Sequence, residues 1–156
     1  MKQFDERGLA QAGIRLIGTG DLTDDDILNE MGDPVVGVIT SHFYSTAHDS
    51  AENREYVAAF RQIAPNMRPN FMSVGGFDGM RLIAEGLRET GGNTDGQRLL
   101  DAMRGKSWVS PRGPITIDRE TRDIIQDVYI RRVERRDGQL WNIEFDRFPQ
   151  VRDPGT

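Results

Sequence analysis

Val35-Val36-Gly37-Val38-Ile39-Thr40 is a run of mainly β-branched residues in which apolar and polar side chains do not alternate. This composition is typical of a strand in a parallel sheet that has both faces buried. Gly32-Asp33-Pro34 precedes the run and ends any helix before it. A second short strand is predicted upstream at Ile14–Ile17. Two such strands separated by a helical segment favour the α/β class.

The segment between the two predicted strands begins with Gly18-Thr19-Gly20-Asp21. Thr23 is then expected to cap a short helix that ends near Met31. Asp24, Asp25 and Asp26 would occupy its first turn, where carboxylates are favoured by the helix dipole. A metal cluster is the alternative for these three acids. It is disfavoured because consecutive helical positions do not converge on one point.

Three helices are predicted downstream, and the first and third of them have a capping signal at the start. The stretch Gly75–Gly79 lies in the second of them, where small residues are expected to let the helix approach a sheet closely. A further helix end is predicted at residues 2–12, before Gly13. The downstream helices span about 49–63, Asn70 or Ser73 to Thr90, and 94–103, and the expected caps of the first and third are Asp49 with Glu52 and Thr94 with Gln97.

The pattern changes after Ser110. A short strand is predicted at Ile115–Ile117, and a longer alternating one at Ile125–Val133. Asp137-Gly138 is typical of a two-residue hairpin turn, and Trp141, Ile143 and Phe145 alternate on the return strand. The tail is therefore an antiparallel hairpin added to parallel strands with flanking helices. Two parallel strands are too few for a free-standing doubly wound domain, so we expect the chain to be a piece of a longer one.

Composition excludes several classes of protein. The chain has 156 residues, about one domain, with 37% apolar residues and a net charge of −5. Disordered chains have fewer apolar residues and a larger charge imbalance. The acidic balance argues against nucleic-acid binding, which needs clustered Lys and Arg. With no cysteine, the chain has no disulfide and no thiolate ligand or nucleophile. No signal peptide is recognised at the start.

Gly20 and Asp21 are the first candidate binding residues. They follow a predicted strand, where open α/β sheets bind ligands. A phosphate-binding loop is disfavoured because the full glycine pattern is missing and the neighbouring acids would repel phosphate. An acid at this place is better suited to a cation such as an ammonium group. The alternative is that Asp21 is satisfied by a local turn.

His42 and His48 are the two histidines of the chain. A catalytic triad could be drawn from Ser41, His42 and Asp49, but residues so close in sequence rarely take up triad geometry. The alternative is that both histidines are ordinary loop residues. His42-Phe43-Tyr44 also forms an aromatic cluster where the second strand leaves the sheet. Ligand contact and plain packing are equally open interpretations of Phe43 and Tyr44.

Taken together, these motifs resemble the carboxyl-terminal half of ABC-importer substrate-binding proteins of the branched-chain amino acid type, which have the type I periplasmic-binding fold. The order and spacing of the motifs carry the resemblance. They are Gly13 to Gly18 with Gly20-Asp21; Gly32-Asp33 with Val36-Gly37-Val38; Tyr44-Ser45; Phe60 with Arg68-Pro69-Asn70; Gly76 to Met80; Ser110 to Ile115; and the hairpin from Tyr129-Ile130 to Asp137-Gly138.

The resemblance implies two lobes joined by three crossovers, with ligand bound between the lobes. Residues 1–43 would belong to lobe two, 44–113 to lobe one and 114–156 again to lobe two. The crossovers would place Ser45, Gly113 and Pro114 at hinges. Gly20, Asp21, Phe43 and Tyr44 would contact the ligand, with Asp21 as the acid that meets an ammonium group.

The function implied is solute capture for an ABC importer, without catalysis, cofactor or metal, in the periplasm. The ligand would be an amino acid, an amide or an aromatic acid, and the full-length protein would dock on an ABC permease. The chain by itself could form a homodimer through uncovered strand edges. Two rival interpretations are a hydrolase that uses His42 or His48 with an Asp, and a ligand-sensing receptor domain of the same fold.

Overall fold

A computed structural model describes residues 2–154. The described residues form one six-stranded sheet, four α-helices and three 3-10 turns. The helices are α1 (Lys2–Glu6), α2 (Ala51–Ile63), α3 (Phe71–Glu89) and α4 (Gly96–Met103); the 3-10 turns are η1 (Gly20–Thr23), η2 (Leu28–Met31) and η3 (Asp33–Val35). The strands are β1 (Ile17–Thr19), β2 (Ile39–His42), β3 (Ser107–Ser110), β4 (Gly113–Ile117), β5 (Ile124–Arg136) and β6 (Gln139–Val151).

The strand order is β1-β2-β5-β4-β3, and β6 pairs with β5. The predicted parallel pairing of β1 with β2 is confirmed, with Ile17 opposite Ile39, whereas the other pairs are antiparallel. β5 pairs with β4 near its start and with β2 through Tyr129–Arg132. The register with β6 shifts twice, once between these two stretches and once within the stretch paired with β2, which marks local irregularities in the long ribbon.

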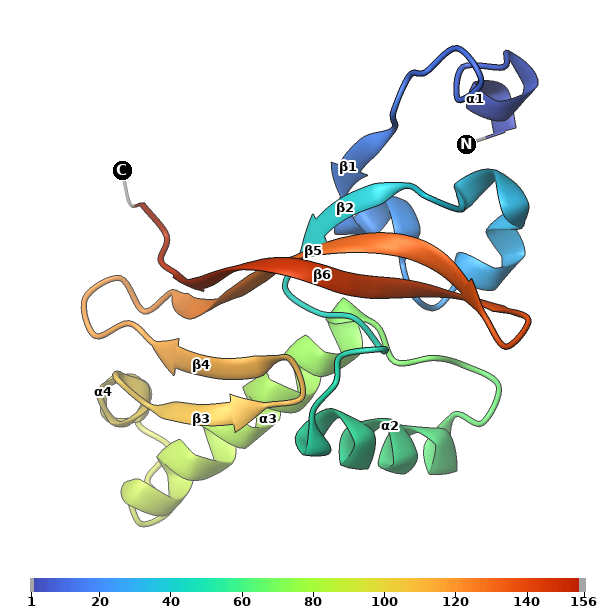
Figure 1. The fold of residues 1–156 in the computed structure, drawn as a ribbon. Helices are drawn as coiled ribbons and strands as arrows, with labels where there is room; N and C mark the ends of the chain where they lie inside the picture. The colour runs from blue at the N-terminus through green and yellow to red at the C-terminus, as the bar shows by residue number, and fades with distance from the viewer. Residues whose placement is uncertain (1, 155–156) are drawn as a thin grey trace.

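The β5–β6 ribbon runs across the middle of the molecule (Figure 1). β1, β2 and the 3-10 turns lie on one side of it, and we call them the β1–β2 group. α2, α3, α4, β3 and β4 lie on the other side, and we call them the α2–α3 group (Figure 1). This arrangement confirms the predicted α/β class with a hairpin tail. The hairpin turn is also confirmed, since Asp137 and Gly138 both have positive φ.

The helices begin close to their predicted positions. The Asn70 side chain accepts a hydrogen bond from the backbone N–H of Ser73, and the Ser73 hydroxyl bonds in return to the Asn70 backbone. The caps of the other two long helices are each one residue from the prediction. Ser50, not Asp49, caps α2 by accepting from the Asn53 N–H, and Asp95, not Thr94, caps α4. Ser50 and Asp95 both have non-helical backbone angles, and the side chain of each accepts a hydrogen bond from a backbone N–H three residues later, as an N-cap requires.

Two small cores stabilise the two groups. Leu28, Val35, Val38, Val133 and Leu140 pack between the 3-10 turns and the hairpin. Tyr44, Tyr56 and Val74 pack between α2, α3 and the segment after β2. Several apolar side chains remain outside both cores. The most exposed are Ile17 on the edge strand β1, Ile63 at the end of α2, and Met72 and Met80 on α3.

Four predictions about the first forty residues are wrong. The first strand begins at Ile17 rather than Ile14, and only Ile39 and Thr40 of the valine-rich run are in β2. Asp33–Val35 forms a 3-10 turn and Gly37 has φ of 86°, so the chain turns before it can join the sheet. The helix expected from Thr23 to Met31 is replaced by short 3-10 turns. β3 was not predicted, and α1 ends at Glu6, well before Gly13.

Among the described residues, no helix combines the length and the apolar character needed to cross a membrane. The same residues contain no group of three or more metal-binding side chains close enough to hold an ion.

Candidate functional site

The ends of β1 and β2 bring Asp21 and His42 together. Parallel strands end at the same edge of a sheet, so the residues that follow them are neighbours. The Nε2 atom of His42 lies 3.6 Å from Oδ1 of Asp21. The Asp21 side chain is 70% exposed, whereas that of His42 is 8% exposed. The Asp21 carboxylate is thus exposed to solvent, next to the buried imidazole of His42.

Gly20 makes this contact possible. A Cβ atom at this position would lie 1.7 Å from Cδ2 of His42, inside the imidazole ring. The backbone carbonyl of Gly20 also accepts a hydrogen bond from Nη2 of Arg131 at 3.2 Å. The residue type therefore follows from the close approach of the η1 backbone to the end of β2.

Three aromatic rings meet beside Asp21, and we call His42, Phe43 and Phe71 the aromatic cluster. The ring centroid of His42 lies 4.4 Å from that of Phe43 and 4.8 Å from that of Phe71. Phe71 is the first residue of α3, so the cluster joins the β1–β2 group to the α2–α3 group. The guanidinium carbon of Arg112 lies 4.9 Å from the centroid of Phe43. The result is an apolar surface with one carboxylate at its edge.

His42 is uncharged at neutral pH. Burial lowers the pKa of the His42 imidazole to about 4, and the positive charge of Arg131 acts in the same direction. The carboxylate of Asp21 opposes both effects without overcoming them. The Nδ1 atom is buried and has no hydrogen-bond partner among the described residues. A neutral ring suits contact with an aromatic or aliphatic ligand better than contact with a carboxylate.

Arg131 stabilises the backbone segments that carry the site. It lies on β5 and its side chain is fully buried. Its guanidinium donates to the carbonyl oxygen of Tyr44 at 2.6 Å and to Oγ1 of Thr40 at 3.1 Å, besides Gly20. One side chain thereby ties the ends of β1 and β2 and the segment after β2 together. Such a charged network fixes the positions of the backbone that carries Asp21 and Phe43.

The three consecutive aspartates do not form the first turn of a helix, so that prediction is wrong. Asp25 is buried and accepts hydrogen bonds from the Thr46 N–H at 3.1 Å and from Nδ2 of Asn142 at 2.9 Å. Burial raises the pKa of the Asp25 carboxyl to about 6, although Arg131 and these hydrogen bonds lower it. Oδ2 of Asp24 accepts from Nδ2 of Asn70 at 3.1 Å, which links the start of α3 to the β1–β2 group.

Tyr44 lies away from this site. Its side chain is fully buried in the core beside α2, and its hydroxyl donates to Oδ1 of Asn53 at 3.0 Å. Burial raises the pKa of the Tyr44 hydroxyl far above its usual value. The structure therefore brings Gly20, Asp21 and Phe43 to His42, whereas the Tyr44 side chain is enclosed in the core against which Phe43 packs. The packing interpretation describes Tyr44 better than ligand contact.

The predicted hinge residues occupy two different settings. Ser45 is fully buried after β2, where its hydroxyl donates to the Asn142 carbonyl at 2.6 Å. Gly113 and Pro114 begin β4, which pairs with β3 on one side and β5 on the other. Gly113 has φ of 98°, and a Cβ there would lie 2.5 Å from the Tyr129 hydroxyl. A hinge role for these residues, like the division at 43 and 113, stays a prediction.

The residues of the possible triad are not assembled. His42 faces Asp21 rather than Asp49, and Asp49 pairs with Arg54 at 2.7 Å. His48 instead bonds through Nδ1 to Oε2 of Glu144 at 2.8 Å. Neither histidine side chain is hydrogen-bonded to a serine hydroxyl in the described part of the chain. The geometry gives no support to a Ser-His-Asp hydrolase.

Two contributors to the site were missed by the sequence reasoning. Phe71 follows the Asn70 cap directly, and a local pattern cannot show that its ring meets His42. Asp78 was interpreted as part of a packing helix, yet its buried carboxylate accepts from Nε1 of Trp108 at 3.0 Å and from Nε of Arg112 at 2.8 Å. This network positions Arg112 above Phe43. The sequence signal that could have identified Asp78 was a single acidic residue among glycines in an otherwise apolar helix.

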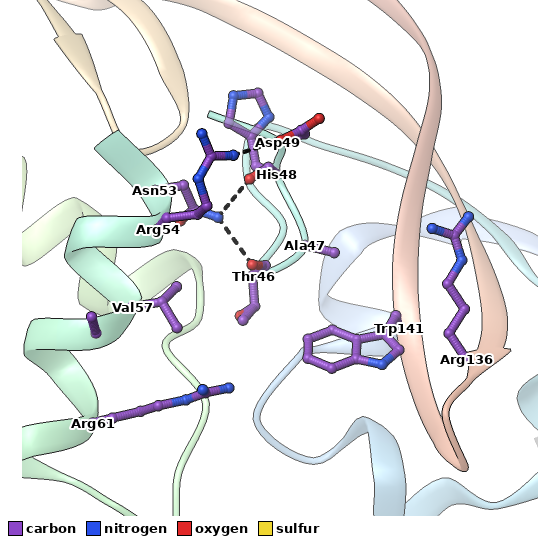
Figure 2. A pocket seen from close by; sticks show the side chains of 11 residues that line it. Thr46, Ala47, His48, Asp49, Asn53, Arg54, Val57, Arg61, Arg136 and Trp141 are labelled. Carbon is purple, nitrogen blue, oxygen red and sulfur yellow. Dashed lines mark hydrogen bonds and ion pairs between the residues drawn. The ribbon is translucent and has the colours of Figure 1, made fainter. Parts of the chain in front are cut away.

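A pocket of about 480 Å³ opens elsewhere, between α2 and the β5–β6 hairpin (Figure 2). None of its lining residues belongs to the aromatic cluster or the η1 turn. They are Thr46, Ala47, His48, Asp49, Asn53, Arg54, Val57, Ala58, Arg61, Arg136 and Trp141.

A site at the ends of parallel strands, beside a ribbon that joins two groups of elements, is typical of the ligand-binding proteins with the type I periplasmic-binding fold. The family described as periplasmic binding protein matches residues 1–139, and the chain belongs to this family. The resemblance inferred from the sequence motifs is thereby confirmed.

Three relatives illustrate the similarity. The Leu/Ile/Val-binding protein homolog 6 of Brucella abortus (strain 2308) is 41% identical over 99% of this chain and 40% of its own length. A solute-binding protein of an ABC transporter from Rhodopseudomonas palustris BisB5, solved with 3,4-dihydroxybenzoic acid, is 58% identical, with a TM-score of 0.93 over 99% of this chain and 42% of its own. A solute-binding protein from R. palustris HaA2, solved with p-hydroxybenzoic acid, is 35% identical, with a TM-score of 0.88 over 94% of this chain and 40% of its own.

The chain thus spans about 40% of the length of the curated relatives it matches. The structural relatives named here are solute-binding proteins of ABC transporters.

Proposed function

We propose that this chain forms the carboxyl-terminal part of a periplasmic solute-binding protein of an ABC importer, and that the ligand is an aromatic carboxylic acid. The observation that carries the proposal is the convergence of the aromatic cluster with Asp21 at the ends of β1 and β2. The relative solved with 3,4-dihydroxybenzoic acid supports the ligand class, since it is 58% identical to this chain.

The composition of the site favours an aromatic ligand over an aliphatic amino acid. Phe43 and Phe71 provide ring faces and edges, and aromatic pairs add about 0.5–1.5 kcal/mol beyond the area that they bury. His42 is neutral because its pKa is lowered to about 4, so it adds a third ring without a charge. A benzoate-sized molecule can therefore rest on the cluster.

Asp21 suits the polar substituents of such a ligand. Its carboxylate can accept hydrogen bonds from ring hydroxyl groups, as it can from an ammonium group. It would repel the ligand carboxylate, which therefore has to point away from this chain. Groups that bind the carboxylate would then be supplied by the remainder of the two-lobed protein.

The proposed lobes follow the two groups of elements except at β4, which lies in the α2–α3 group but would belong to lobe two from Pro114 onward. Residues 1–43 would lie in lobe two and 44–113 in lobe one, with 114–156 returning to lobe two and Ser45, Gly113 and Pro114 near the crossovers. Closure of the lobes on the ligand would bury the aromatic cluster and exclude water. The closed form would then dock on the permease, and no catalytic step is involved.

Isothermal titration of the full-length protein tests the proposal. We expect 3,4-dihydroxybenzoate and 4-hydroxybenzoate to bind, benzoate to bind more weakly because it lacks the hydroxyl groups that Asp21 would accept, and L-leucine not to bind. Native mass spectrometry of protein purified without refolding provides a second measurement, because a bound aromatic acid would appear as added mass.

Binding of L-leucine or L-valine without binding of any benzoate would overturn the assignment of the ligand class. Turnover of an ester or amide that is lost when His42 or His48 is replaced would overturn the solute-binding role itself.

A further inference from the structure

The pocket between α2 and the hairpin concentrates positive charge in a chain whose net charge is −5. Arg54, Arg61 and Arg136 line it together with the indole of Trp141 (Figure 2). Its volume of about 480 Å³ is in the range of pockets that hold small organic ligands. The pocket takes no part in the function proposed above.

Arg61 is the arginine of this pocket whose charge is not balanced. Arg54 pairs with Asp49 at 2.7 Å, and Arg136 pairs with Glu134 at 2.9 Å. Arg61 has neither a hydrogen bond nor an ion pair with any other residue in the described range 2–154. Figure 2 shows its side chain extending from α2 toward the side of the pocket where Trp141 lies.

A second guanidinium group approaches the same indole. The Cζ atom of Arg68 lies 3.9 Å from the ring centroid of Trp141, and its Nη1 donates to the carbonyl of Leu140. Burial lowers the pKa of the Arg68 guanidinium; the negative charge of Asp25 raises it, and the positive charge of Arg61 lowers it. Arg61 and Arg68 are thus close enough to repel each other, and an anion between them would remove this repulsion.

The remaining walls show which kind of anion fits. Ala47, Val57 and Ala58 give the pocket an apolar lining in addition to the indole. A flat ring could contact these side chains and Trp141, while its anionic group accepts hydrogen bonds from Arg61. An inorganic anion would leave the apolar walls unused, and a neutral ring would leave Arg61 without a partner. We propose that this pocket binds a flat aromatic anion, at a site separate from Asp21 and the aromatic cluster.

Titration calorimetry of the full-length protein with naphthalene-2-sulfonate tests this site. We expect binding that weakens as salt is added, because an exposed charge pair is screened. Arg61→Gln should weaken binding about fivefold or more, since it removes a charge-assisted hydrogen bond. Trp141→Leu should weaken it similarly through loss of the ring contact. Circular dichroism establishes that each variant is folded.

Arg88→Gln is the matched control. Arg88 is also an exposed arginine in the last turn of a helix, but it lies on α3 outside the pocket. Its replacement should leave the affinity unchanged, as should Asp21→Ala, which alters the other site. Equal affinities for Arg61→Gln and Arg88→Gln would overturn the proposal, and so would absence of binding. Loss of binding in Asp21→Ala would also overturn the proposal, because the probe would then bind at the aromatic cluster. That result would leave the proposed function intact.

Discussion

Nη1 of Arg131 lies 3.9 Å from Oδ2 of Asp25, and the two side chains are only 2% and 3% exposed. The arginine is held by carbonyl and hydroxyl oxygens from three segments, whereas the carboxylate is held by Thr46 and Asn142. A buried pair of this kind links the β1–β2 group to the ribbon. Removing one member leaves the other charge buried without compensation.

Arg131→Met is therefore expected to lower the free energy of unfolding by about 3–5 kcal/mol. Urea denaturation followed by circular dichroism measures the change. Arg98→Met, at an exposed position on α4, serves as the control and should stay within about 0.5 kcal/mol of the parent. An equally small effect for Arg131→Met would show that the pair contributes nothing to stability.

Asp25 and His42 should give opposite contributions to the pH dependence of stability. The pKa of Asp25 rises from 3.8 to about 6 on folding, so the folded state holds its proton more tightly and its contribution falls as pH rises from 4 to 6. The pKa of His42 falls from 6.5 to about 4, so the unfolded state holds its proton more tightly and its contribution rises over the same range. The two effects therefore oppose each other in the parent protein.

Single variants separate these two contributions. In His42→Phe the free energy of unfolding should decrease from pH 4 to pH 6, because the contribution of Asp25 remains alone. In Asp25→Asn the free energy of unfolding should increase over the same range, because the contribution of His42 remains. Urea titrations at several pH values measure the slopes. Parallel slopes in the two variants would contradict the prediction.

Asp78 is expected to hold α3 against β3. Its carboxylate accepts from Trp108, Ser110 and Arg112, so Asp78→Ala leaves three buried donors unsatisfied. We expect a loss of about 3–5 kcal/mol in the free energy of unfolding and a red shift of Trp108 fluorescence. Asp101→Ala, on the surface of α4, is the control and should change neither quantity. An unshifted emission spectrum in Asp78→Ala would argue against the hydrogen bond to the indole.

Gly20→Ala and Gly76→Ala should have effects of opposite sign. The added methyl group at Gly20 would overlap His42, which costs about 1–3 kcal/mol or more. Gly76 lies in α3 with open space around its Cα, so alanine should stabilise the helix by about 0.5–1 kcal/mol. Thermal unfolding of both variants checks the pair. A neutral Gly20→Ala would mean that His42 has another position available.

Asp21→Ala should weaken binding of 3,4-dihydroxybenzoate to the full-length protein about tenfold or more, because a charge-assisted hydrogen bond contributes about 1.5–3 kcal/mol. Calorimetric titration provides the dissociation constant. Glu30→Ala, at an exposed acid on η2, controls for the general change in charge. Unchanged affinity in Asp21→Ala would remove Asp21 from the site.

Local signals in the sequence predicted the three downstream helices and the hairpin well. The Asn70 cap with Ser73 and the Asp137-Gly138 turn act over a few residues, so their patterns are complete within a short window. The parallel pairing of two short strands also followed from composition. The bounds of β2 did not, because its register is set by pairing with β5, about ninety residues away.

The site was predicted only in part for the same reason. Gly20, Asp21 and Phe43 follow the predicted strands directly, so their position near a sheet edge could be inferred. The ring of Phe71 and the burial of Asp25 depend on partners distant in sequence, such as Asn142, which is 117 residues from Asp25. Tyr44 shows that neighbours in sequence need not share a surface. It follows Phe43 directly, but its side chain is buried in the core.

The long strand β5 has a mechanical consequence. It is hydrogen-bonded to β4 at its beginning and to β2 farther along, and its register with β6 is irregular at Gln126/Val128 and Ile130/Arg131. Torsion of one group of elements against the other would be taken up at these irregular steps, where the ladder already lacks regular bonds. We therefore expect the angle between the groups to change at these steps while β5 keeps its pairing with β4 and with β2.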